Sequence, residues 1–359
     1  MASQVALISK IYQVIKGYRE GDLKRKSITK KGIKNWITQF NVSHRNLVLT
    51  ELCNIFKRRY FSKRKIKAIL VKMIVEISDD LGFRSPKAFL KHAQFIRIQN
   101  IGKSQQDLLD LLSEVLEKKF SVSLVNCGSY SSRYSIYLDD MLCTGQTLRK
   151  DLIKWGHAAF PSSRITNKIA LERGRTKLVL IYLFCHMREY RKKLFDLETN
   201  YFQEKNFDPM LYCEEVIDNN FLTSKQQMIL PSRSVASKKV IKYMDQVNAE
   251  VDEHIASLDF KSRKMRFFRP INFPRKELFY LSPDSRNTVE KVFLLKGIDI
   301  AMQAINRKVN IRPLGYSLPS ARNFGFGALC FTYRNISNNT PLVFWYSFTS
   351  FQPLFKKRE

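Results

Sequence analysis

The sequence contains no closely spaced cysteine pair and no long hydrophobic run. Its six cysteines are scattered over 359 residues, without a C-x-x-C pair and without a histidine at zinc-site spacing. They are therefore expected to be reduced thiols. The longest apolar stretch, LVLIYLFC, is about half as long as a membrane span requires, and the first residues lack the pattern of a signal peptide. We expect a cytoplasmic protein with no membrane partner.

Acidic residues are also scarce. Lys and Arg number 62 against 32 Asp and Glu, which gives a formal net charge of +30. This excess exceeds what solubility needs and favours a polyanionic partner such as nucleic acid or an acidic protein. A generally basic surface is the alternative. The apolar content of 44% is ordinary for a chain with real hydrophobic cores.

Hydrophobic periodicity divides the chain into three expected domains. Residues 1–90 have helical spacing and many basic side chains, residues 91–215 alternate strands with helices, and residues 216–359 form a less regular α+β region. The expected fold is α/β, with a mostly parallel sheet flanked by helices, and ligands bind such sheets beyond the carboxyl ends of the strands. The expected strands of the middle domain are FIRIQ, SVSLVN, YSIYLDD and KLVLIYLF.

Two adjacent aspartates, Asp139 and Asp140, stand at the end of one of these strands. Burial of two neighbouring carboxylates is costly, so a ligand, a metal or solvent is expected to meet them. The turn TGQT then leads into a helix, whose first backbone N–H groups and dipole can hold a phosphate. If that phosphate is the 5′ group of a ribose, the aspartates can accept hydrogen bonds from the 2′ and 3′ hydroxyls.

The stretch YSIYLDDMLCTGQT resembles the 5-phosphoribosyl-1-pyrophosphate (PRPP) motif of the phosphoribosyltransferase superfamily. The resemblance implies a phosphoribosyltransferase-type sheet, a phosphoribosyl donor (PRPP or a nucleotide) and Mg²⁺ carried with the donor. It assigns the catalytic roles to four residues: Asp139 and Asp140 contact the ribose hydroxyls, and Lys103 and Arg133 contact the diphosphate. It assigns the remaining donor contacts, in the 5′-phosphate turn and in an earlier diphosphate loop, to Cys143, Thr144, Gly145, Gln146, Thr147, Gly102 and Ser104.

Two positions depart from the motif. Purine-salvage members often carry an acid where this chain has Cys143, so a purine-salvage role is not expected. Gln146 stands where the family usually has a small residue, and its larger side chain either narrows the phosphate pocket or adds a hydrogen-bond donor to it. Arg133 ends the loop CGSYSSR, which occupies the place of the family's mobile active-site cover.

The two ends of the chain, with NWITQF and RPLGYSLPS, resemble phosphoribosyltransferase-like proteins of bacterial anti-phage conflict systems, including effectors associated with retrons. This resemblance implies a toxin or effector whose partner is a reverse transcriptase with its RNA-linked DNA. Such a partner would account for the net charge. Since phosphoribosyltransferase folds also serve as regulators, a nucleotide-sensing, nucleic-acid-binding protein without turnover is the alternative function.

The stretch FKRRYFSKRKIK places basic residues between the aromatics Phe56, Tyr60 and Phe61, a pattern that suits nucleic-acid binding. The alternative is a solvated helical face whose aromatics enter the core. A second basic aromatic segment is KSRKMRFFRPINFPRK. The candidate nucleic-acid contacts in the first stretch are Lys57, Arg58, Arg59, Lys63, Arg64, Lys65 and Lys67.

Other interpretations of the same residues stay open. A strand before GKS also suggests a nucleotide P-loop, although that motif requires glycine where the chain has Arg97. The aspartate pair could instead be solvated at a turn, with one of them capping the helix. Near the C-terminus, the segment NFGFG predicts turns and packing, or a hood over an acceptor base formed by Asn323, Phe324 and Phe326.

Overall fold

The computed structural model describes residues 2–22, 27–203, 207–218, 226–256, 267–304, 307–347 and 349–356. Internal contacts divide the chain into two compact units. We call residues 63–217 the sheet unit, and residues 1–62 with 218–359 the split unit. The expected boundary at residue 215 thus falls near the end of the sheet unit, whereas the expected helical domain 1–90 is shared between the two units.

The sheet unit is built on four parallel strands, which confirms the expected α/β fold. Their order in the sheet follows the chain, and because every pairing is parallel, the four strands point their carboxyl ends in the same direction. Almost every residue of the two central strands is buried, as in a parallel sheet that is covered on both faces. The strands are β2 (Ala93–Phe95), β3 (Tyr134–Leu142), β4 (Lys177–His186) and β5 (Met210–Ile217).

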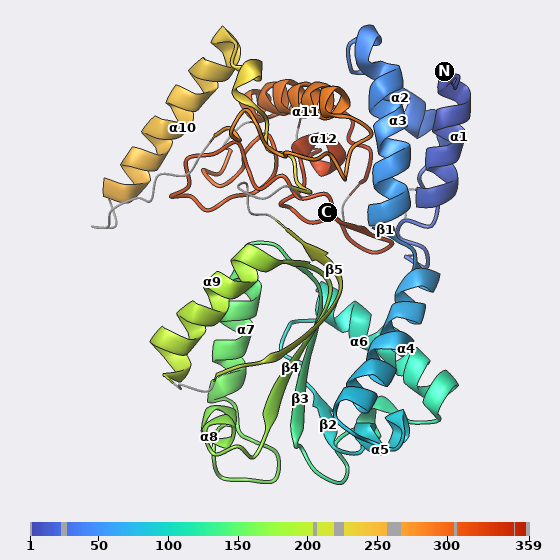
Figure 1. The fold of residues 1–359 in the computed structure, drawn as a ribbon, viewed down its shortest axis with the longest axis vertical. Coiled ribbons are helices and arrows are strands. Elements are labelled where there is room, and N and C mark those ends of the chain that lie inside the picture. The colour runs from blue at the N-terminus through green and yellow to red at the C-terminus, as the bar shows by residue number, and fades with distance from the viewer. Residues whose placement is uncertain are drawn as a thin grey trace. The chain divides into compact units, whose positions relative to one another are not determined.

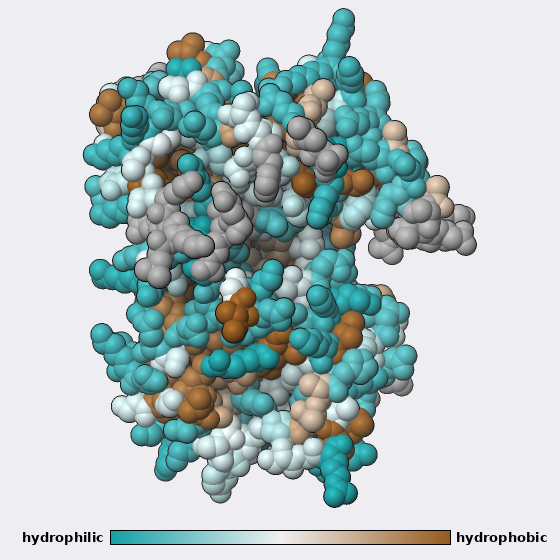
Figure 2. Space-filling view, turned by 180° about the vertical axis from the view of Figure 1, so that it is seen from behind, coloured by the Kyte–Doolittle hydropathy of each residue, from teal (hydrophilic) through white to brown (hydrophobic). Residues whose placement is uncertain are grey.

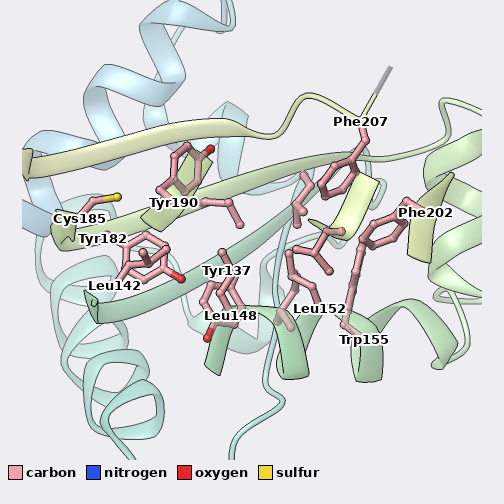
Figure 3. Close-up of a cluster of buried hydrophobic side chains, with 14 residues drawn as sticks. Tyr137, Leu142, Leu148, Leu152, Trp155, Tyr182, Cys185, Tyr190, Phe202 and Phe207 are labelled. Atoms are coloured by element: carbon pink, nitrogen blue, oxygen red, sulfur yellow. The ribbon is translucent and has the colours of Figure 1, made fainter. Parts of the chain in front are cut away.

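Helices cover both faces of this sheet (Figure 1). On one face, Tyr137 and Tyr182 pack with Leu148, Leu152 and Trp155 in a buried apolar cluster (Figure 3). Helices α7 and α9 supply this face, and α4 and α6, which contact each other, cover the opposite one. The helices of the unit are α4 (Lys63–Asp80), α5 (Pro86–Leu90), α6 (Ser104–Phe120), α7 (Gln146–His157), α8 (Asn167–Glu172) and α9 (Met187–Leu197).

The split unit has a predominantly helical, aromatic core. The indole of Trp36 donates a hydrogen bond of 2.8 Å to the carbonyl of Val343 and stacks on Phe344, so the two ends of the chain share this core. The expected helix in NTVEKVFLLKGIDIAMQAI corresponds to α11, and the remaining C-terminal chain is largely turns. The elements are α1 (Gln4–Ile15), α2 (Lys30–Thr38), α3 (Val42–Arg59), β1 (Tyr60–Phe61), α10 (Lys238–Ala256), α11 (Pro283–Gln303), β6 (Phe331–Thr332) and α12 (Leu342–Trp345).

Three details of the sheet differ from the expected strands. The strand expected in FIRIQ is displaced, because β2 spans Ala93–Phe95 and ends at the first residue of that stretch. The strand expected in SVSLVN is wrong: this segment forms a short 3₁₀ turn in which Leu124 is buried and Val125 is 84% exposed. Its apolar residues are too few to cover both faces of a strand. The strand β5 was not predicted, because its residues MLYCEEVI are mostly half-buried and mix apolar with acidic side chains.

Hydrophilic side chains cover most of the face shown in Figure 2. Within the described ranges, every helix is too short or too polar to cross a lipid bilayer.

The buried sheet predicts a sharp difference between two apolar truncations. Leu180 lies in the middle of β4 and is fully buried, whereas Ile101 is 98% exposed. We expect Leu180→Ala to lower the free energy of unfolding by about 2–5 kcal/mol, through lost transfer energy and a residual cavity. The control Ile101→Ala should change it by less than about 0.5 kcal/mol. Denaturant titration of both variants measures the difference, and equal effects would contradict the described core.

Candidate active site at the carboxyl edge of the sheet

Three segments meet Asp139 near the carboxyl end of β3. Ser104, the first residue of α6, donates from Oγ to Asp139 Oδ1 at 2.9 Å, and the backbone amide of Asp140 donates to the same oxygen at 2.9 Å. Gln99 Nε2 and the Tyr137 hydroxyl each donate to Oδ2 at 3.2 Å. The structure therefore brings together Asp139 and Ser104, two residues of the predicted site.

These hydrogen bonds occupy most of the carboxylate of Asp139. A carboxylate has about four acceptor positions, and this one meets three protein donors and the Tyr137 hydroxyl, whose single hydrogen is also within reach of Asp151. Burial raises the pKa of Asp139, while the hydrogen bonds from Asp140 and Ser104 oppose that rise. A ribose hydroxyl could approach this side chain only by replacing one of its present donors.

Asp140 is also buried but leaves the sheet on the other side. It is 6% exposed and follows Asp139 within β3. Successive side chains of a strand point to opposite faces. The two aspartates are therefore not placed side by side in one pocket, as the sequence analysis had expected for a diol. Within the described residues, no three His, Cys, Asp or Glu side chains are grouped so as to hold a metal ion.

The turn after β3 leads into α7 through a left-handed glycine. Gly145 adopts a left-handed conformation, with φ of 71°, and precedes α7 without a side-chain cap. Among the hydrogen bonds of the described residues, none is donated by the backbone amides of Gln146, Thr147 or Leu148. Thr147 and Gln146 are exposed, Thr144 is half-buried and Cys143 is buried. Free amides at a helix N-terminus favour a bound anion.

Lys193 of α9 covers this turn, although no sequence pattern pointed to it. A Cβ atom at Gly145 would lie 2.4 Å from Lys193 Cγ, so the lysine stem packs directly on the glycine. Its ammonium group lies 3.8 Å from Asp196, whose carboxylate also accepts a hydrogen bond of 2.7 Å from Arg149. The turn thus has basic side chains at hand from both α7 and α9.

The side chain of Gln105 fixes the start of the predicted diphosphate loop between β2 and α6. The buried side chain of Gln105 accepts hydrogen bonds from the amides of Ile98 and Gln99, at 3.0 and 3.1 Å. Gly102 has a positive φ of 88°, and Lys103 is exposed at the N-cap of α6. The loop therefore presents Lys103 to solvent at the carboxyl edge of the sheet.

Arg133 lies far from these residues. It precedes β3, whose nine residues separate it from the turn at Gly145, and a strand rises about 3.3 Å per residue. Its guanidinium packs on the ring of Tyr134, 5.7 Å from the ring centroid. The loop CGSYSSR enters a parallel strand, so it lies at the amino edge of the sheet and does not bring Arg133 to the predicted site.

Asp151 is the buried residue of this site that the sequence analysis missed. It lies on α7 and accepts hydrogen bonds from Gln99 Nε2 at 2.9 Å and from the Tyr137 hydroxyl at 2.8 Å. Asp151 falls between Leu148 and Trp155 on the apolar stripe of its helix. A charged residue within such a stripe was the available signal.

The basic stretch separates into buried and exposed residues. Phe56, Tyr60 and Phe61 are all buried, which excludes them as stacking platforms and agrees with the alternative that the aromatics enter the core. Arg59 is 2% exposed and bonds to the side chain of Gln227, and Arg58 donates to the carbonyls of residues 278 and 279. Lys57 and Arg64 are exposed, Lys65 is half-buried, and both Lys63 and Lys67 pair with Glu114.

The predicted hood residues belong to the split unit. Phe324 is buried against Phe267 and Phe268, and the side chain of Asn323 accepts a hydrogen bond from the amide of Gly325. These contacts favour the packing interpretation, while Phe326 is half-buried. In the second basic aromatic segment, residues 261–266 lie outside the described residues.

A protein-family model described as PRTase-CE matches residues 33–357. The chain belongs to the PRTase-CE family. Its parallel sheet with flanking helices fits a phosphoribosyltransferase-like protein. No curated protein and no solved structure matches the chain.

The contact between Lys193 and Gly145 predicts unequal effects at two glycines. Gly145 and Gly174 both have left-handed φ values, 71° and 64°, but an added Cβ has open space only at Gly174. We expect Gly174→Ala to cost about 1 kcal/mol in unfolding free energy, from backbone strain alone. Gly145→Ala should cost about 1–3 kcal/mol more because of the clash.

The double variant Gly145→Ala with Lys193→Ala separates strain from crowding. Removal of the lysine stem should recover the additional loss, which a double-mutant cycle of denaturant titrations measures. Additive effects of the two substitutions would contradict the packing of Lys193 on this turn.

Proposed function

We propose that this PRTase-CE protein binds a phosphoribosyl donor, either PRPP or a nucleotide, at the carboxyl edge of its sheet. The observation that carries the proposal is the Thr144–Thr147 turn. It joins a buried parallel strand to an uncapped helix through a left-handed glycine, which is an arrangement suited to a terminal phosphate. The match to the family model supports the same assignment.

In this proposal the 5′-phosphate binds the amides and hydroxyls of the turn. Lys103 and Lys193 neutralise the phosphates, in place of the distant Arg133. Because Asp139 and Asp140 leave the strand on opposite faces, the proposal gives each of them a separate contact with the sugar. A sugar hydroxyl that reaches Asp139 replaces Gln99 or Tyr137 as its donor. The donor brings Mg²⁺ on its diphosphate, so the ion is treated as part of the ligand.

Transfer at the anomeric carbon is the proposed chemistry. Positive charge develops on the sugar and negative charge on the departing diphosphate, which carboxylates and basic side chains respectively stabilise. The acceptor would be a base, a nucleotide, a macromolecule or water. The alternative is a sensor that binds the same ligand without turnover, and release of pyrophosphate distinguishes the two.

We expect Asp140→Asn to weaken binding of PRPP with Mg²⁺ by about ten- to a hundredfold, because one charge-assisted hydrogen bond contributes about 1.5–3 kcal/mol. Asp79→Asn is the matched control, since Asp79 is an exposed acid on α4. Isothermal titration of the full chain measures both affinities. Wild-type protein that does not bind the donor, or equal affinities for both variants, would contradict the proposal.

We further propose that the chain is an effector of a bacterial defence system and acts with a nucleic-acid partner, such as a reverse transcriptase with its RNA-linked DNA. The net charge of +30 supports a polyanionic partner. Of the basic residues singled out in the sequence, Lys57, Arg58 and Arg64 are exposed, and Arg58 donates to the carbonyls of residues 278 and 279. Lys57 and Arg64 are therefore the best placed to contact phosphates.

The double variant Lys57→Ala with Arg64→Ala should weaken nucleic-acid binding and lower the salt slope by about one for each lost phosphate contact. Lys118→Ala with Lys119→Ala removes the same charge from exposed residues of α6 and is the control. Fluorescence anisotropy with a labelled oligonucleotide at several salt concentrations measures the slopes. If both double variants give the same slope, the two residues belong to a solvated surface.

A further inference from the structure

Asp139 and Asp151 share their hydrogen-bond donors. Gln99 Nε2 lies 2.9 Å from Asp151 Oδ2 and 3.2 Å from Asp139 Oδ2. The Tyr137 hydroxyl lies 2.8 Å and 3.2 Å from the same two oxygens. Because both oxygens are within 3.2 Å of one nitrogen, they are at most about 6 Å apart. Two carboxyl groups therefore occupy one small buried space.

The hydrogens of Tyr137 and Gln99 are too few to fill every short contact between these side chains and the two carboxyl groups. The hydroxyl of Tyr137 has one hydrogen, and the shorter contact gives it to Asp151. The amide of Gln99 has two hydrogens but lies within 3.2 Å of three oxygens, those of Asp139, Asp151 and Tyr137. One further hydrogen, carried by a carboxyl group, would allow all of these short contacts to be hydrogen bonds.

Within the part of the chain that the structure describes, neither carboxyl group forms an ion pair. Among the ion pairs of the described residues, none includes Asp139 or Asp151. The titratable groups that face Asp139 are Tyr137 on its own strand, Tyr182 on the neighbouring strand and Asp151 on α7. The side chains reaching it from α6 and from the preceding loop, Ser104 and Gln99, are uncharged.

We propose that the Asp139 carboxyl keeps a proton at pH values where an exposed aspartate is ionised, and that Asp151, which shares the donors of Asp139, is a positioning residue for it. Like charges that share a small buried site cannot both ionise easily. Burial raises the pKa of Asp139, and the charge of Asp151 acts in the same direction.

The proton has a consequence for ligand binding, which rests on the proposed function. Ribose hydroxyls donate hydrogen bonds and therefore favour an ionised Asp139. Donor affinity should rise with pH as Asp139 loses its proton, and Asp151→Asn should move that rise to lower pH. The proton itself does not depend on any ligand, so it can be tested without one.

The test is the pH dependence of unfolding of the full chain, wild type against Asp151→Asn. An acid whose pKa is raised on folding keeps its proton where the unfolded chain has lost it. Stability therefore falls as pH rises from about 4 through the raised pKa. For each unit by which folding raises the pKa of Asp139, the folding equilibrium constant of the wild type should fall by about tenfold across this pH range. The equilibrium constant of Asp151→Asn should fall clearly less.

Asp196→Asn is the control with the opposite sign. Burial alone would raise the pKa of Asp196, but hydrogen bonds from Asn200 and Arg149 outweigh it and lower the pKa. Its contribution to stability is present above the unfolded pKa and is lost as pH falls. The stability advantage of the wild type over Asp196→Asn should therefore shrink as pH falls, whereas the stability loss that comes from the raised pKa of Asp139 appears as pH rises.

An infrared measurement keeps the proposal testable if a variant folds poorly. The wild type should show the carbonyl stretch of a buried protonated carboxyl, and Asp139→Asn and Asp151→Asn should each abolish it. A stability profile of Asp151→Asn that parallels the wild type, or a wild type without the protonated carboxyl band, would overturn the proposed proton on Asp139. Loss of donor binding with the band intact would overturn only the proposed function.

Discussion

A buried carboxylate must have its acceptor positions filled, and at Asp139 this requirement joins separate parts of the sheet unit. The donors come from the start of α6, from the loop before it and from β3 itself. An unsatisfied charge at this depth would cost several kcal/mol. The loop after β2 and the N-terminus of α6 are consequently fixed against the end of the central strand.

The same edge carries the turn that gives the chain its resemblance to phosphoribosyltransferases. β2 pairs with the first residues of β3, and the chain after β2 continues along β3 until Gln99 and Ser104 reach Asp139, which brings the loop containing Lys103 to the carboxyl end of β3. Helix α9 starts directly after β4 and lays Lys193 on the turn. Residues distant in sequence thus reach one edge through short connections.

Local patterns predicted most of what depends on local sequence. The apolar strand before Asp139, the turn through Gly145 and helix α7 follow from hydrophobic periodicity and glycine conformation, and the structure has them at the expected places. The sequence could not predict Asp151 as a partner of Asp139, because that contact depends on how α7 packs on the sheet. Lys193 was missed for the same reason.

The failed expectations also have physical causes. Arg133 was placed by analogy to a cover loop, but a loop that enters a parallel strand lies at the wrong edge. The basic stretch looked uniform in sequence, whereas the phase of α3 buries Arg59 and exposes Lys57. Adjacent aspartates suggested one shared diol, although strand alternation sends them to opposite faces.

The most direct measurement is a crystal structure of the full chain with PRPP and Mg²⁺. We predict the 5′-phosphate against the backbone amides of Gln146 and Thr147, with Lys193 moved to meet it and ribose hydroxyls at an aspartate of β3. Donor density elsewhere, with Lys193 still packed on Gly145 and Asp139 still bound by Gln99 and Tyr137, would contradict the proposed site.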